Sequence, residues 1–334
     1  MKVAGIEVGD RPLILAPMED VTNPPFRKFC KKYGADWLYS EFVSADALVR
    51  SVNKSLKKLT IDETERPVTI QIYGRFIDSM VEAAKIVEEV RPDFIDINFG
   101  CPVKRVAQKG AGAGMLKDIP LMVEMTRQIV QAVKIPVTAK TRLGWDCEHI
   151  IIEDIAERLQ DVGIQALAIH GRTRSQMYSG EADWEPIARV KQNPRIKIPI
   201  IGNGDIDSPQ KVKEAFERYG VDGVMIGRAT IGKPWIFEQI KHYLATGEVL
   251  PELSVAAQVE IIKEQILLSM EWLDEVRGLF HMRRHMACMF KGLPHFRDLR
   301  IQMLQAPTIE ELWGVFDQIV ERYGSMDPND RVDE

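Results

Sequence analysis

Short apolar runs alternate with stretches of helical periodicity along the first two thirds of this 334-residue chain. Runs of five to seven apolar residues that are bounded by turn residues are typical of strands buried on both faces. We therefore predict eight strands, at residues 13–17, 37–42, 68–74, 94–100, 136–142, 166–171, 199–204 and 223–227.

The segments between these strands contain recognisable helix ends. In "TNPPFRKFCKKYG", Asn23 is the expected N-cap, Pro24 takes the first helical position and Gly34 follows the last turn. "DSPQKVKEAFERYG" repeats the scheme with Ser208 as the cap, and "DIPLMVEMTRQIVQAV" shows helical apolar spacing. Eight alternating strand and helix units predict an α/β fold, a (β/α)₈ TIM barrel, over residues 1–245. A doubly wound sheet is the alternative, but the first strand ends in "APMED" rather than in a glycine-rich turn.

The pattern changes after residue 247, where no further strand is evident. Apolar residues step by three or four between Val255 and Leu273, and further helical runs span about 277–291 and 308–323. We predict a small all-helical C-terminal domain over residues 250–330.

Composition favours a protein of the reducing cytoplasm. The four cysteines form no CxxC pair, so neither a disulfide framework nor a zinc site is indicated. The N-terminus lacks the apolar stretch of a signal peptide, and no segment reaches the ~20 apolar residues of a membrane helix. The net charge of −5 does not indicate a nucleic-acid partner, so such an inference has to rest on local clusters.

Polar residues gather at the C-terminal ends of the predicted strands, which form the working face of a barrel. Together these ends carry Pro17, Met18, Glu41, Gln71, Asn98, Lys140, Arg142, His170, Asn203, Gly204, Asp205, Gly227 and Arg228, most of which are polar. An unpaired lysine at this place would be costly, so Lys140 predicts an anionic partner. "IGNGDI" and "IGRA" close strands seven and eight, where barrels often bind phosphate. A histidine such as His170, taken alone, more often has a structural role.

Cys101 lies just past the fourth strand and precedes Pro102, which favours an extended backbone. The thiol could simply be a small apolar group at the end of a strand. Its position beside a phosphate-binding cavity also allows it to give or take a proton. The "GAGAG" run at 110–114 lacks the dinucleotide spacing, and we interpret it as a hinge or loop.

Several motifs together resemble the tRNA-dihydrouridine synthase family, specifically its bacterial B-type branch. They are "APMEDVTNPPFR", "DINFGCPVKRV", "GAGAGML", "VTAKTRLGW", "IHGRTRSQMYSGEADW", "IGNGDI", "GVMIGRATIGKPW" and, near the C-terminus, "MRRHMACMFKGLPHFR". They occur in the family's order and cover essentially the whole chain.

The resemblance implies FMN in the barrel mouth, NADPH or NADH as reductant, and a tRNA uridine, in the D-loop, as substrate. The positions expected to hold FMN are Pro17, Met18, Glu19, Gln71, Lys140, His170, Asn203, Gly204, Asp205, Gly227 and Arg228. Glu19 departs from the small residue that is usual after "APM", although its main chain could still serve.

The chemistry of uracil reduction gives two of these residues a role. Reduced FMN would deliver hydride to C6 while Lys140 stabilises the anionic reduced ring. Cys101 would be the catalytic general acid that protonates C5. Such a thiol should not be strongly acidified, because a thiolate cannot donate a proton.

Candidate contacts with tRNA form two groups. Asn98, Lys104, Arg105 and Arg142 lie close to the cysteine in the sequence or at a strand end. Arg277, Arg284 and Lys291 form a predicted helical stripe opposite an apolar face, with few acids nearby. Solvated surface charge would explain the same pattern.

Two other functions remain open at this stage. One is an FMN-barrel dehydrogenase of a free pyrimidine such as dihydroorotate, and the other is a non-catalytic tRNA-binding protein. We expect no metal and no membrane association, and we favour a monomer. The sequence does not indicate which uridine is reduced.

Overall fold

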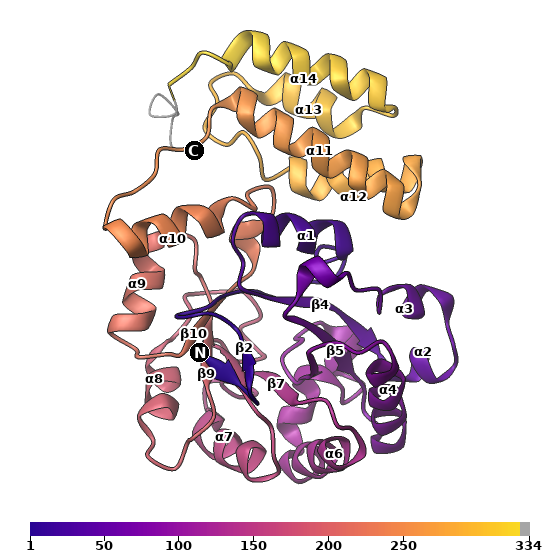
Figure 1. Ribbon diagram of the computed structural model, residues 1–334, viewed down its shortest axis with the longest axis vertical. Coiled ribbons are helices and arrows are strands. Elements are labelled where there is room, and N and C mark those ends of the chain that lie inside the picture. The colour runs from indigo at the N-terminus through magenta and orange to yellow at the C-terminus, as the bar shows by residue number, and fades with distance from the viewer. Residues whose placement is uncertain (328–334) are drawn as a thin grey trace. The chain divides into compact units, whose positions relative to one another are not determined.

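The computed structural model describes residues 1–327, which form two compact units, Met1–Gly227 and a second that begins at Arg228. In the first unit eight parallel strands close into a barrel in the order β10-β3-β4-β5-β6-β7-β8-β9 (Figure 1). The strands are β3 (Leu13–Leu15), β4 (Trp37–Ser44), β5 (Val68–Tyr73), β6 (Phe94–Asn98), β7 (Val137–Arg142), β8 (Leu167–His170), β9 (Ile200–Asn203) and β10 (Gly223–Ile226). The predicted TIM barrel is confirmed, and each predicted strand overlaps an observed one.

Helices follow the strands around the barrel (Figure 1). They are α1 (Pro24–Lys32), α2 (Ala45–Val49), α3 (Asn53–Lys57), α4 (Ile77–Glu89), α5 (Lys104–Ala107), α6 (Ile119–Ala132), α7 (Ile152–Asp161), α8 (Glu185–Gln192) and α9 (Pro209–Glu217), with the 3-10 turns η1 (Glu63–Glu65) and η2 (Gly112–Lys117). The side chains of Asn23 and Ser208 cap α1 and α9 as predicted.

An N-terminal hairpin covers the barrel end opposite the polar strand ends. Its strands β1 (Lys2–Val3) and β2 (Ile6–Glu7) pair antiparallel, and Val3 joins a buried cluster that includes Trp37 and Phe94. Because Trp37 and Phe94 are the first residues of β4 and β6, this cluster fills the N-terminal end of the barrel. A ligand site can therefore form only at the opposite end of this barrel, where the strands end in polar residues.

The second unit is helical in the part that the structure describes. It contains the turn η3 (Arg228–Thr230) and the helices α10 (Ile236–Thr246), α11 (Val255–Leu273), α12 (Glu275–Met286), α13 (Arg297–Gln305) and α14 (Ile309–Tyr323). The predicted boundary at residues 245–250 places α10 with the barrel, whereas the compact units divide at Gly227. That boundary stays a prediction, and residues 328–330 of the predicted domain lie outside the described range.

One predicted helix was too long. The apolar spacing continues to residue 291, but α12 ends at Met286, and Lys291 lies in a turn beyond it. Leu279, Met282 and Met286 are buried as predicted. Within residues 1–327, no helix is both long enough and apolar enough to span a bilayer.

Candidate active site at the mouth of the barrel

Hydrogen bonds between neighbouring strands lead from the barrel interior to Cys101. The register places Gln71 opposite Asp96 and Asp96 opposite Thr138. Asp96 accepts hydrogen bonds from Thr138 Oγ1 and Gln71 Nε2, both at 2.7 Å, and Asn98 Nδ2 donates to Gln71 Oε1 at 2.7 Å. Asn98 Oδ1 then accepts the main-chain N–H of Cys101 at 2.9 Å. The network fixes where the main chain of the cysteine leaves β6.

Asp96 is the buried carboxyl at the centre of this network. Burial raises its pKa from 3.8 to about 7, although the hydrogen bonds from Thr138 and Gln71 and the charge of Lys140 act in the opposite direction. The sequence analysis did not single out Asp96. Its signal was a carboxylate inside the otherwise apolar run "FIDIN".

The Cys101 thiol lies in a mostly apolar setting. It packs with Val106 and Ala111, and the partly buried Phe42 and Tyr73 rest against this cluster. Burial raises the pKa of the thiol, and this outweighs the main-chain N–H of Val103 and the nearby cations. The thiol therefore stays protonated at neutral pH, which is the state that a proton donor requires.

Arg142 supports the loop that carries the cysteine. Its guanidinium is buried and donates to the main-chain oxygens of Gly100, Thr173 and Met177, at 2.8–2.9 Å. It also lies over the ring of Tyr178, 5.7 Å from the centroid. The structure thus shows that Arg142 ties the loops after β6 and β8 together, while its contact with a substrate stays a prediction.

Lys140 is a half-buried ammonium at the end of β7, opposite Asn98 in the register. Its Nζ donates to Asn203 Oδ1 at 3.1 Å, and Asn203 in turn donates to the main-chain oxygen of Met225 at 2.8 Å. Among residues 1–327 no carboxylate forms an ion pair with Lys140. Burial lowers its pKa from 10.5 to about 8. A cation that lacks a counterion in this position fits an anionic ligand.

The ends of β8 and β9 are joined by Arg172, which the sequence analysis also missed. Its guanidinium pairs with both oxygens of Asp205, at 2.8 and 2.7 Å, and lies near His170 Nε2 at 3.5 Å. Gly204 has a φ of +133°, and a Cβ there would lie 2.6 Å from the Cβ of Ala182. His170, Asn203, Gly204 and Asp205 therefore do converge. Both carboxylate oxygens of Asp205 accept hydrogen bonds from Arg172.

The segment after β3 has a local arrangement of its own. The Glu19 side chain turns to Lys58, whose Nζ lies 2.7 Å from Glu19 Oε1 and 3.3 Å from Glu41 Oε1. Burial raises the pKa of Glu19. Pro17 and Met18 are partly buried, and Met18 Sδ would lie 3.5 Å from a Cβ added to Gly227. One side of the barrel mouth is thus formed by Pro17, Met18 and Gly227. The carboxylate of Glu19 is paired with Lys58.

The remaining predicted cations lie on surfaces. Lys104 and Arg105 are exposed on α5. In the second unit, Arg284 and Lys291 are exposed, and Arg277 is exposed but ion-paired with Asp274. Arg228 is exposed within η3 of the same unit. The roles assigned to these residues stay predictions.

Comparison with known proteins identifies the group to which this barrel belongs. The family profile described as "Dihydrouridine synthase (Dus)" matches residues 14–320. The chain belongs to the dihydrouridine synthase family. Members of this family are flavin-dependent oxidoreductases, which agrees with an uncompensated cation at the barrel mouth.

Relatives of this dihydrouridine synthase extend over most of its length. It is 42% identical over 290 residues to the tRNA-dihydrouridine synthase B of Pseudomonas aeruginosa, which covers 87% of both chains. It is 39% identical over 329 residues to a probable tRNA-dihydrouridine synthase of Rickettsia bellii, with 98% of both chains covered. The predicted family and its B-type branch are confirmed.

Solved structures support the fold alone. A 2-naphthoyl-CoA reductase complexed with 2-naphthoyl-CoA superposes with a TM-score of 0.59 at 13% identity, covering 72% of this chain and 51% of that one. A histamine dehydrogenase from Rhizobium sp. 4-9 gives a TM-score of 0.54 at 11% identity, covering 71% and 47%. This dihydrouridine synthase thus spans about half the length of these proteins and shares their barrel.

Proposed function

We propose that this protein reduces the C5=C6 bond of a uridine in tRNA to 5,6-dihydrouridine, with FMN as its flavin and NADPH or NADH as reductant. The proposal is carried by one juxtaposition, a protonated thiol and an ammonium without a counterion at the same barrel mouth. Membership of the dihydrouridine synthase family and the names of its relatives support the tRNA substrate.

The residues at the mouth fit an FMN group. Lys140 is a half-buried cation with an amide oxygen as its neighbour, and its lowered pKa would return toward normal beside an anion. Gly204 is buried and adopts a positive φ where a side chain would collide with Ala182, so only glycine fits at this strand end. When bound, the flavin would supply the hydride that adds to C6 of uracil.

Lys140 would hold the N1 and O2 edge of the ring, and the segments of Asn203–Asp205 and Gly227–Arg228 would hold the phosphate. Pro17, Met18 and the main chain of Glu19 would border the ring, and His170 would contact it. The Gln71 amide already bonds to Asp96 and Asn98, so it would act on the flavin chiefly by fixing these neighbours.

Cys101 would deliver the proton to C5. The main-chain bond to Asn98 and the packing of the thiol against Val106 and Ala111 fix its position before a substrate arrives. Its raised pKa keeps the proton on sulfur until carbon can accept it. Asn98, Arg142 and the exposed Lys104 and Arg105 would contact the nucleotide and its neighbours.

The proposal predicts a specific purified activity. The protein should release FMN on denaturation, oxidise NADPH, and form dihydrouridine in tRNA from cells that lack this modification, as measured by nucleoside mass spectrometry. Free uridine and dihydroorotate should not react. Turnover of a free pyrimidine without tRNA would favour a small-molecule dehydrogenase, and a protein purified without flavin that takes up none would contradict the proposal.

A further inference from the structure

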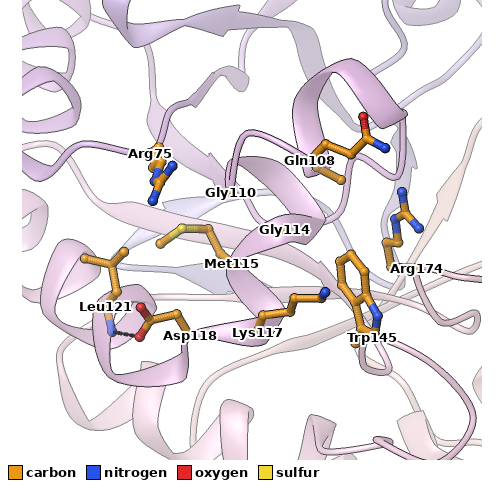
Figure 2. Close-up of a pocket in the computed structure, with 11 residues that line it drawn as sticks. Arg75, Gln108, Gly110, Gly114, Met115, Lys117, Asp118, Leu121, Trp145 and Arg174 are labelled. Carbon is orange, nitrogen blue, oxygen red and sulfur yellow. Dashed lines mark hydrogen bonds between the residues drawn. The ribbon is translucent and has the colours of Figure 1, made fainter.

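A cavity of about 610 Å³ lies beside the segment that carries Cys101 (Figure 2). It is bordered by residues that follow β5, β7 and β8 and by the α5–η2 segment. The lining residues are Arg75, Ala107, Gln108, Gly110, Gly114, Met115, Lys117, Asp118, Leu121, Trp145 and Arg174. The flavin site described above uses none of them.

The charges that line this cavity are unbalanced. Three cations, Arg75, Lys117 and Arg174, face one acid, Asp118, whose Oδ1 accepts the N–H of Leu121 at the start of α6. Within the part of the chain that the structure describes, the side chains of these three cations form no ion pair and no hydrogen bond to another residue. In an acidic protein, such a set attracts an anion.

Some exposed cations elsewhere on the same barrel are compensated. Arg158 pairs with Asp154 at 2.8 Å, and Arg189 pairs with Glu153 at 2.8 Å. Both arginines are about half exposed. The cavity differs from these two sites because it brings three cations together without an ion pair.

Trp145 holds two of the cations in place without neutralising them. Lys117 Nζ lies 4.0 Å from the ring centroid, and the guanidinium carbon of Arg174 lies 4.6 Å from it. A cation–π contact orients a cation while it keeps its full charge, whereas a carboxylate would cancel that charge. Two main-chain bonds join the loops concerned, Arg174 N to Gly144 O and Ser175 N to Trp145 O, both at 2.9 Å.

The guanidinium of Arg174 offers the cavity its terminal nitrogens. Its Nε is buried without a hydrogen-bond partner and is shielded from the cavity, whereas its terminal nitrogens form no hydrogen bond within the described residues. A phosphate oxygen bound by these terminal nitrogens would form charge-assisted hydrogen bonds and would offset the charge of the cavity.

The cavity and the catalytic thiol share one closely packed segment. A Cβ on Gly112 would lie 3.1 Å from the Cβ of Cys101, and a Cβ on Gly114 would lie 2.3 Å from the main-chain oxygen of Ala107. Gly110 packs in the same way against the side chain of Arg75, at 3.2 Å. A ligand in the cavity would therefore contact the segment that positions the thiol.

We propose that this cavity binds a backbone phosphate of the RNA substrate, next to the nucleotide that carries the reacting uracil. This inference rests on the proposed function. A nicotinamide dinucleotide also carries phosphates, but its reactive ring has to reach the flavin. RNA continues on both sides of the reacting base, so its phosphates are expected outside the barrel mouth as well. Arg174, Arg75 and Lys117 would contact the phosphate, and Trp145 would be a positioning residue.

The test is the salt dependence of tRNA binding by the flavin-loaded protein. The double variant Lys117→Gln with Arg174→Gln should bind tRNA about 10- to 100-fold more weakly and uniformly across tRNA sequences. The slope of log K against log salt should become shallower by about 0.7, because the contact with one phosphate of single-stranded RNA is lost. Trp145→Leu should also weaken binding, and Trp145→Phe should retain most of the affinity.

A matched control removes two charges elsewhere. Arg158→Gln with Arg189→Gln on the same barrel should leave the slope unchanged. Lys117→Gln alone replaces an exposed side chain, so it should fold even if the double variant does not, and its slope should fall by about half as much.

Two outcomes would overturn the proposal. One is an unchanged tRNA affinity and slope in a folded, flavin-loaded double variant. The other is a raised KM for NADPH with unchanged tRNA binding, which would assign the cavity to the dinucleotide. Failure of the proposed function itself is distinguishable, because the wild-type protein would then form no dihydrouridine in tRNA.

Discussion

Replacing Asp96 with asparagine tests the buried network that positions the thiol. The change keeps the shape of the side chain and removes a carboxyl group that no solvent reaches. Thr138 can rotate its hydroxyl to accept a hydrogen bond from the new amide, so the network can re-form with one bond altered. The charge is therefore the main quantity that changes.

The pH dependence of stability follows from the pKa of Asp96, which burial raises from 3.8 to about 7. Between these values the folded protein holds a proton that the unfolded chain has already lost. The contribution of Asp96 to stability should thus be highest near pH 4 and should fall as pH rises to about 7. At about 1.4 kcal/mol per pH unit, the fall attributable to Asp96 is about 4 kcal/mol.

Asp96→Asn should lack this fall. At low pH the variant should be less stable than the wild type by about 1 kcal/mol, the typical value of one altered hydrogen bond. Above pH 7 it should be more stable by a few kcal/mol, because no buried charge forms. The two stability curves should therefore cross between pH 4 and 7.

The assay is urea unfolding followed by circular dichroism at several pH values from 4 to 8.5, with flavin content matched between proteins. Asp207→Asn is the control, since Asp207 is a well-exposed aspartate that pairs with Lys211 on the surface. Parallel curves for Asp96→Asn and the wild type would show that the carboxyl has an ordinary pKa. The account of the network given above would then be wrong.

Three further predictions concern the proposed roles. The FMN affinity of the wild-type apoprotein should fall as pH rises through about 8, where Lys140 loses its proton, whereas that of Lys140→Met should be low and independent of pH across this range. Wild-type tRNA reduction by Lys140→Met would contradict this role. Cys101→Ala should bind FMN and oxidise NADPH normally, but its single-turnover reduction of tRNA should be slower by about 10²–10⁴-fold. An unchanged rate would make Cys101 structural. Reversing Arg277, Arg284 and Lys291 to glutamate should weaken tRNA binding and flatten its salt slope, while NADPH oxidation with an artificial acceptor persists. An unaltered slope in the folded triple variant would exclude these residues from the RNA interface.

The barrel strands could be predicted because each is a short apolar run, buried on both faces and followed by a turn. Most of the elements that were missed are too short to show a period, and α13, which has nine residues, buries only Leu299 and Met303 and so shows little apolar spacing. β1 and β2 have two residues each, and α2 and α3 have five each. The second helix of the C-terminal unit was extended to residue 291 because its apolar spacing continues past its last turn.

For the candidate site, the sequence predicted which residues lie at the ends of strands, but not which side chains they contact. That the polar strand ends meet follows from the barrel, but their partners depend on the register. Gln71 reaches Asp96 because β5 and β6 place them opposite each other, and Arg172 reaches Asp205 from the neighbouring strand end. The sequence also offered no sign that Lys58 would form an ion pair with Glu19, because the two residues are 39 positions apart.

The glycine run shows that one residue type can meet two physical requirements at once. It was interpreted as a hinge or loop, because glycine widens the range of backbone conformations. In the structure Gly112 and Gly114 are buried in η2, where an added Cβ would meet Cys101 or Ala107. Lack of volume is therefore required at both positions, and Gly112 also adopts a φ of +54°, a left-handed conformation that favours glycine. Asn98 holds the main chain of Cys101, Arg142 holds Gly100, and the glycines let η2 pack closely behind the thiol. If Cys101 is the proton donor that we propose, it would need little rearrangement when a base enters, since its orientation is set when the chain folds.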